Sequence, residues 1–167
     1  MEKLRGGDRR SIGRSNEVAR EISNNPKLFA QVVAAMRNSN PVIRMRAADA
    51  IEKASARNPK LLQPHKRIVL KKIAAIPQQE VRWHIAQIIP RLQLTPKELD
   101  HAVSILFDYL DDKSSIVKTF AMQALADLAQ QDSRLRKRIV PILEFLSANG
   151  TPAMRARGRK LLAILNR

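Results

Sequence analysis

Three consecutive side chains near the middle of the chain combine a guanidinium, an aromatic ring and an imidazole. They are Arg82, Trp83 and His84, and Trp83 is the one tryptophan in the sequence. Such a group could stack on a nucleic-acid base or take part in acid–base catalysis, or it could belong to an ordinary amphipathic helix. The choice depends on the elements that position these side chains.

The other residues that could do chemistry are too scattered to predict a reactive site. His65, His84 and His101 lie in separate segments without metal-ligand spacing, and the chain has no Cys. The carboxylates of DYLDDK are typical of a solvated turn, and RGGDRRSIGRS lacks the Lys-Ser/Thr ending of a phosphate-binding loop. We therefore expect no catalytic residue, metal, cofactor or small-molecule ligand, and we do not expect an enzyme.

Composition indicates a helical protein that attracts anions. Hydrophobic residues make up 44% of the 167 residues, aromatics only 4%, and Gly occurs five times, a balance that favours helices over strands. Lys and Arg number 31 against 15 Asp and Glu, a net charge of +16. Residues 1–80 carry 17 basic and 7 acidic side chains, residues 81–133 carry 5 and 7, and residues 134–167 carry 9 and 1. The two ends supply the excess charge, which predicts an anionic partner.

The first thirteen residues are expected to form a flexible basic arm. They include RGGDRR and have no apolar stretch of the kind that a secretory signal requires. No run elsewhere approaches the ~18 apolar residues that a membrane span needs. We expect a soluble, cytoplasmic protein without a membrane partner.

The stretch around Trp83 recurs along the chain. Nine-residue segments beginning at positions 43, 81, 117 and 154 share an apolar residue, then a basic residue, then an apolar pair at the end, and the starts are 38, 36 and 37 residues apart. Their apolar residues fall at i, i+4, i+7 and i+8, which is one face of a helix. A second apolar segment and a short polar turn precede every copy. The sequence therefore predicts repeated helix pairs and an all-α fold.

Small polar residues mark the expected starts of the first helices. Asn25, Asn58 and Thr95 each precede a proline, and proline is well tolerated in the first helical turn. We expect all three residues to act as N-caps.

The predicted helix pair resembles the HEAT repeat. The resemblance rests on Pro141, which falls where the family often has a proline, on the Ala-rich second helices, and on the apolar–basic pairs that open them: Ile43-Arg44, Val81-Arg82, Val117-Lys118 and Met154-Arg155. It implies a short right-handed α-solenoid of about four HEAT-like helix pairs plus an N-terminal capping helix, RSNEVAREIS, with the second helices on the concave side. After the arm of residues 1–13, we expect one domain over 14–167, with repeats at roughly 26–57, 59–92, 95–130 and 132–166.

The repeat register separates structural residues from candidate contacts. A ladder of basic residues recurs at the repeat period and is expected to bond to turn carbonyls of neighbouring repeats: Arg44, Arg82, Lys118 and Arg155. Trp83 and Met45 occupy equivalent positions off the main apolar stripe, so we expect them on a partly exposed concave strip. With variable basic residues they form the predicted binding surface: Met45, Trp83, Arg46, Lys53, Arg57, His84, Arg155, Arg157 and Arg159. Two other basic groups, KRIVLKK and RLRKR, lie on first helices and are predicted to be convex, so the sequence leaves open whether the concave or the convex face binds.

These features predict a non-catalytic interaction or scaffold module that binds an acidic partner protein through a basic curved surface. A preformed surface loses little ordering entropy on association. Nucleic acid is the alternative partner, since clustered Lys and Arg neutralise phosphates, although the near-neutral middle of the chain interrupts a continuous basic stripe. A HEAT-like DNA glycosylase, which uses Trp, Asp and Arg in a concave groove, is a less favoured resemblance.

Overall fold

The computed structural model describes residues 2–6 and 11–166, in which the ordered elements are all helical. The all-α prediction is therefore confirmed for the described residues. The chain forms two compact units, Met1–Leu94 and Thr95–Arg167, and each has its own buried apolar residues. Of the predicted arm, residues 1 and 7–10 lie outside the described residues.

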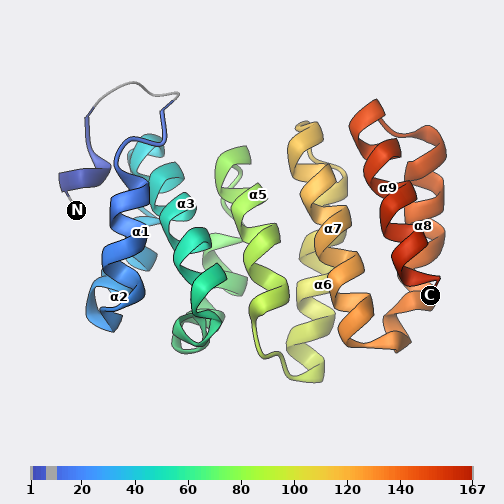
Figure 1. The fold of residues 1–167 in the computed structure, drawn as a ribbon, viewed down its shortest axis with the longest axis horizontal. Helices are drawn as coiled ribbons and strands as arrows, with labels where there is room; N and C mark the ends of the chain where they lie inside the picture. The colour runs from blue at the N-terminus through green and yellow to red at the C-terminus, as the bar shows by residue number, and fades with distance from the viewer. Residues whose placement is uncertain (1, 7–10, 167) are drawn as a thin grey trace. The chain divides into compact units, whose positions relative to one another are not determined.

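In the first unit, the central helix α3 packs against α1, α2 and α5. Figure 1 shows α1, α3 and α5 side by side within this unit. The helical elements of the unit are, in chain order, η1 (Glu2–Leu4), α1 (Ser15–Ser23), α2 (Pro26–Ala35), α3 (Pro41–Arg57), η2 (Pro59–His65), α4 (Lys66–Ile68), η3 (Val69–Ile73), α5 (Gln79–Ile88) and η4 (Ile89–Arg91). Of these, η1, η2 and η4 are 3-10 helices and η3 is a π-helical turn.

The apolar stripe predicted from the repeat pattern forms the core of the first unit. Ile51 on α3 and Ile85 on α5 have no exposed surface, and the small residues Ala47 and Ala50 are equally buried. Small side chains let neighbouring helices approach closely, while each fully buried Ile contributes about 1.5–3 kcal/mol relative to an exposed one. The periodicity thus identified the buried face of these helices.

In the second unit, α7 packs against α6, α8 and α9, and α8 also packs against α9. The elements are α6 (Pro96–Leu110), α7 (Ser115–Gln131), the 3-10 helix η5 (Ser133–Leu135), α8 (Arg136–Asn149) and α9 (Pro152–Leu165). Helices α8 and α9 are closely packed at Gly158, where an added Cβ would lie 2.0 Å from Ser147 Oγ. A larger residue than glycine would force these helices apart.

Two of the three predicted N-caps are confirmed, and one is wrong. Asn25 Oδ1 accepts hydrogen bonds from the amides of Lys27 and Leu28, and Thr95 forms a reciprocal capping box with Glu98. Asn58 makes no side-chain cap, because the chain continues after it into a 3-10 helix instead of an α-helix. The Asn-Pro pair alone does not show whether a 3-10 helix or an α-helix follows.

The described part of the predicted N-terminal arm packs against the first unit. Element η1 contacts α1 and α3, and Leu4 has no exposed surface. Gly6 and Gly13 adopt φ values of 70° and 56°, a backbone region that favours glycine. These two residues allow the segment to turn back onto the unit.

Candidate anion-binding surface

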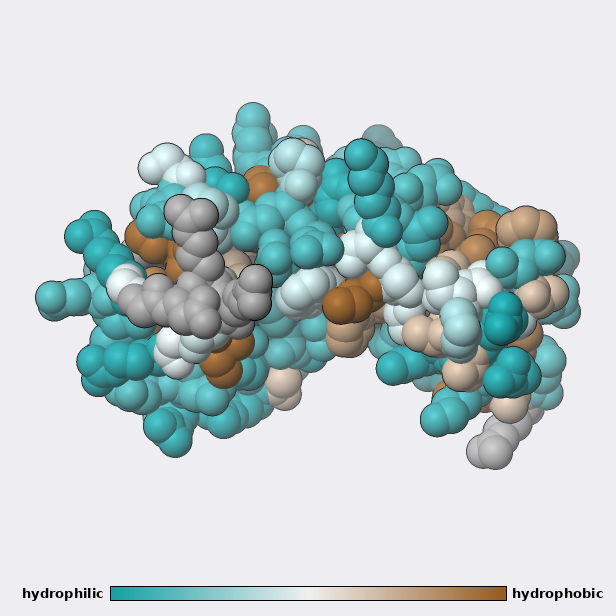
Figure 2. Space-filling model, turned by 90° about the horizontal axis from the view of Figure 1, so that it is seen from above, coloured by the Kyte–Doolittle hydropathy of each residue, from teal (hydrophilic) through white to brown (hydrophobic). Residues whose placement is uncertain are grey.

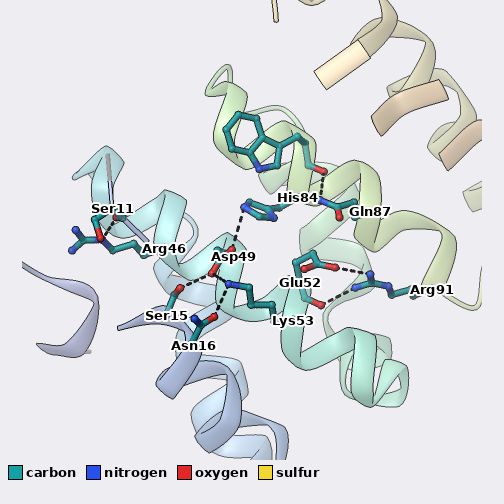
Figure 3. Close-up of polar contacts among 11 residues, drawn as sticks. Ser11, Ser15, Asn16, Arg46, Asp49, Glu52, Lys53, His84, Gln87 and Arg91 are labelled. Atoms are coloured by element: carbon teal, nitrogen blue, oxygen red, sulfur yellow. Dashed lines mark hydrogen bonds and ion pairs between the residues drawn. The ribbon is translucent and has the colours of Figure 1, made fainter. Parts of the chain in front are cut away.

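Arg46, expected on the binding surface, lies in the interior of the first unit and is only 1% exposed. Its Nε donates to Ser11 O at 3.0 Å (Figure 3), and its Nη1 donates to the carbonyl oxygens of Leu4 and Gly6 at 3.2 and 2.5 Å. The expectation of an exposed contact was wrong, because the N-terminal segment covers this side chain. Arg46 instead attaches that segment to α3.

Lys53 and His84, two other predicted surface residues, belong to a polar cluster around Asp49 (Figure 3). Asp49 is 6% exposed and accepts hydrogen bonds from Ser15 Oγ and, at 2.7 Å, from Lys53 Nζ. Lys53 Nζ also donates to Asn16 Oδ1 at 2.6 Å. His84, which is buried, places Nε2 3.8 Å from Asp49 Oδ1. Lys53 therefore balances a buried carboxylate, and the cluster links α1, α3 and α5.

Ser15, Asp49 and His84 are the residue types of a hydrolytic triad, but they are arranged differently. In a triad the serine hydroxyl donates to the imidazole, whereas Ser15 Oγ donates to Asp49. Ser15 has no exposed surface and so cannot meet a substrate. Burial also lowers the pKa of His84 below its usual 6.5, although the nearby Asp49 carboxylate opposes this shift. This geometry does not supply an activated serine.

Trp83 and Met45 lie partly exposed on α5 and α3. The Trp83 ring meets the His84 ring edge-on, with 5.7 Å between centroids. Arg82, the third member of the consecutive trio, donates through Nε to Ile76 O at 3.3 Å. Trp83 and His84 thus contact each other through their rings, whereas Arg82 binds the turn that precedes the helix.

Arg82 belongs to the basic ladder, whose arginines bind the turns before their own helices. Arg44 Nη1 donates to Asn38 O at 2.8 Å, and Arg155 Nη1 donates to Gly150 O at 3.1 Å. Lys118, at the equivalent position on α7, is half-buried. These carbonyls belong to the turn of the same helix pair, whereas the ladder was expected to bond to turn carbonyls of neighbouring repeats; Arg44 Nε reaches the next turn through the Gln78 side chain, at 2.8 Å from Oε1.

The remaining members of the predicted surface differ in exposure. Arg155 and Arg159 on α9 are exposed, whereas Arg157 is half-buried and donates to Gln123 Oε1 at 2.6 Å. Arg57, at the end of α3 in the first unit, is exposed. Of the nine predicted surface residues, only Arg57, Arg155 and Arg159 therefore present exposed cations.

A denser group of exposed cations follows Arg57 along the chain. Between Glu52 and Glu80 the sequence has seven basic residues and no acidic one. Five of the seven are exposed, and we call them the cationic face: Arg57, Lys60, Arg67, Lys71 and Lys72. They lie on consecutive elements of the first unit that contact one another, since α3 contacts η2, and α4 contacts both η2 and η3.

The helix through α4 and η3 holds three of these cations on its solvent side. Val69 and Ile73 are fully buried, whereas Arg67, Lys71 and Lys72 are exposed. The π-helical turn is closed by a 2.9 Å hydrogen bond from Ala74 N to Val69 O. The buried aliphatic residues thereby fix which way the cations face.

The cationic face lacks internal counter-charges. Among the described residues, no carboxylate forms an ion pair with any of its five members. The large exposed hydrophobic residues in the described chain also lie elsewhere, at Ile12, Ile116, Phe145 and Ile164. Figure 2 likewise shows hydrophilic residues over most of the visible surface, with hydrophobic residues in separate patches. Like charges held together without counter-charges attract an anion.

The predicted surface did not include Lys60, Arg67, Lys71 or Lys72. The family resemblance assigned binding to the second helices, whereas these residues lie on the segment before α5. The signal that identifies them was present in the sequence, since the 27 residues from 53 to 79 contain no Asp or Glu. Arg67, Lys71 and Lys72 belong to KRIVLKK, the basic group that the repeat register assigns to the convex side.

Neither a metal cluster among the described residues nor a match to a family model or curated protein indicates the function. Within residues 2–6 and 11–166, no group of three or more His, Cys, Asp or Glu side chains could hold a metal ion. In the same residues, no helix is both long and apolar enough to cross a membrane. No protein-family model matches the chain, and no curated protein shows significant similarity to it. The feature that bears on function is therefore the set of exposed side chains, above all those of the cationic face.

Proposed function

We propose that the chain is a non-catalytic binding module of HEAT-like repeats that holds an anionic macromolecule on its cationic face. The observation that carries the proposal is the set of five exposed cations with no carboxylate partner among the described residues. An acidic protein and a nucleic acid are the two classes of partner with the matching charge.

The packing inside each unit supports the repeat architecture. The second helices of consecutive predicted repeats contact each other, α3 with α5 in the first unit and α7 with α9 in the second. Stacking of equivalent helices is how repeat proteins bury a continuous core. A right-handed solenoid with this stacking would present the cationic face as a rigid surface, so that little conformational entropy is lost on binding.

Fluorescence anisotropy with two labelled polyanions tests the proposal. The probes are a poly-glutamate peptide and a short DNA duplex, each titrated with the full chain near physiological ionic strength, about 0.15 M. We expect at least one probe to bind, and its affinity to fall about tenfold or more when all five residues of the cationic face are replaced by Gln.

The matched control replaces five exposed cations elsewhere by Gln: Arg20, Lys97, Lys113, Lys137 and Lys160. It removes the same charge, so binding that responds to net charge alone would weaken equally in both variants. Equal weakening, or no binding of either probe, would overturn the proposal.

A further inference from the structure

We infer that the partner of the cationic face is duplex nucleic acid, held through its phosphates without regard to base sequence. This inference rests on the proposed function and names the partner class. Three features of the face favour phosphate over an acidic protein and a duplex over a single strand.

The first feature is the absence of an apolar anchor. Protein–protein interfaces concentrate aromatic and apolar side chains at their centre and are depleted in Lys. The cationic face contains Lys60, Lys71 and Lys72, and none of the large exposed hydrophobic residues of the described chain lies between positions 53 and 79. Binding energy at this face would come from charge, as in contacts to a phosphate backbone.

The second feature is the type of cation, since three of the five members of the face are lysines. A lysine ammonium is a flexible point charge that binds phosphate without demanding a fixed geometry. The face also has two exposed arginines, Arg57 and Arg67, whereas two other arginines of the first unit are used internally, Arg46 on backbone carbonyls and Arg91 on Glu52 at 2.6 Å. The lysines of the face are suited to phosphates as point charges, and the guanidinium groups of its arginines bind phosphate as well.

The third feature is the lack of a stacking surface. Proteins that bind single strands stack bases on exposed aromatic rings. Residues 53 to 79 contain no Phe, Trp or Tyr, and His65 is half-buried with its ring 5.6 Å from that of Phe29. Because phosphate contacts carry no base information, binding should be independent of sequence.

The salt dependence of binding measures the number of phosphates contacted. If all five cations each neutralise one phosphate, log K falls against log salt with a slope of about −4.5 on duplex DNA. Replacing Lys71 and Lys72 together by Gln should reduce the slope by about 1.8, since each lost contact removes about 0.9. The matched double variant, Lys97→Gln with Lys113→Gln in the second unit, should keep the original slope.

The experiment measures anisotropy between about 50 and 200 mM salt. Its probes are two labelled duplexes of unrelated sequence, a single strand of equal length and a poly-glutamate peptide. We expect both duplexes to bind equally, and at least about tenfold more tightly than the peptide.

Other binding results would contradict the inference, the proposed function or both. A peptide that binds as tightly as the duplex would overturn the inference but leave the proposed function standing with an acidic protein as partner. A preference for the single strand, or for one duplex sequence, would overturn the duplex-backbone assignment. A slope that falls equally in the matched control would show attraction to net charge and overturn the placement on this face, and binding of no probe would overturn both proposals.

Discussion

The two units use similar basic segments differently. In the first unit, Arg67, Lys71 and Lys72 of KRIVLKK pair with no carboxylate among the described residues. In the second unit, Arg134 of RLRKR lies 2.6 Å from Asp132 Oδ2, and this hydrogen bond lowers the pKa of Asp132. Arg138 of the same segment lies 3.7 Å from Asp100 Oδ1. The charge available to a partner thus depends on nearby carboxylates as well as on the number of cations.

The same contrast applies to two arginines at equivalent repeat positions. Arg46 on α3 is buried and donates to three backbone carbonyls, whereas Arg157 on α9 is half-buried and donates to the Gln123 side chain. The repeat position is the same, but the surrounding chain is not. Whether a residue is buried depends on the chain segment that covers it, and the repeat register does not specify that segment.

The largest expected effect is on the free energy of unfolding, when Arg46 is replaced and compared with Arg157. Arg46→Met leaves the buried Leu4 carbonyl oxygen and two part-buried carbonyl oxygens, of Gly6 and Ser11, without their donor. We therefore expect a loss of about 2–4 kcal/mol in the free energy of unfolding. Arg157→Met, which removes a partly exposed hydrogen bond, should lose less than about 1 kcal/mol. Urea denaturation followed by circular dichroism measures both. Equal losses would show that the two environments do not differ energetically.

A smaller effect should follow from freeing the paired cations of the second unit. Replacing Asp100 and Asp132 by Asn removes the partners of Arg138 and Arg134, and we expect duplex affinity to rise about threefold near physiological salt. The control replaces Asp108 and Asp111, which are exposed, by Asn and makes the same change in net charge. An equal rise in the control, measured by anisotropy, would assign the effect to net charge.

The smallest effect should be a change in pH dependence at His84. Burial lowers its pKa in the folded chain, with Asp49, Glu52 and Glu80 opposing and Lys53 adding to the shift. The unfolded chain therefore binds a proton at higher pH than the folded chain, and stability falls as pH drops below about 6.5.

Urea denaturation between pH 7 and about pH 5 checks this dependence. The free energy of unfolding of the native chain should fall more steeply than that of His84→Gln. His101→Gln, which changes an exposed histidine of the second unit, should follow the native chain. Parallel curves for the native chain and His84→Gln would refute the assignment.

Local sequence pattern predicted the helices well, because an amphipathic period and a cap involve residues a few positions apart. The buried faces of α3 and α5 and the caps at Asn25 and Thr95 follow from such patterns. The Lys53–Asp49 pair, at i and i+4 spacing, was equally local and could have been expected.

The misplaced site residues depend on contacts between distant parts of the chain. Arg46 meets carbonyls 35 to 42 positions away, and Ser15 meets Asp49 across 34 positions. Helical periodicity carries no information about such contacts, so it placed Arg46 on the surface. The cationic face, by contrast, follows from a local absence of acidic residues and was recognisable in the sequence alone.

The attachment of the N-terminal segment has a consequence for how this region could diverge. Arg46 binds main-chain oxygens of Leu4, Gly6 and Ser11, and every amino acid offers such an oxygen. The attachment depends instead on the path of the backbone, which turns at two glycines with positive φ. At Gly13 an added Cβ would also lie 2.9 Å from the Arg46 guanidinium. Homologous chains that keep this attachment should therefore retain the arginine and the glycines.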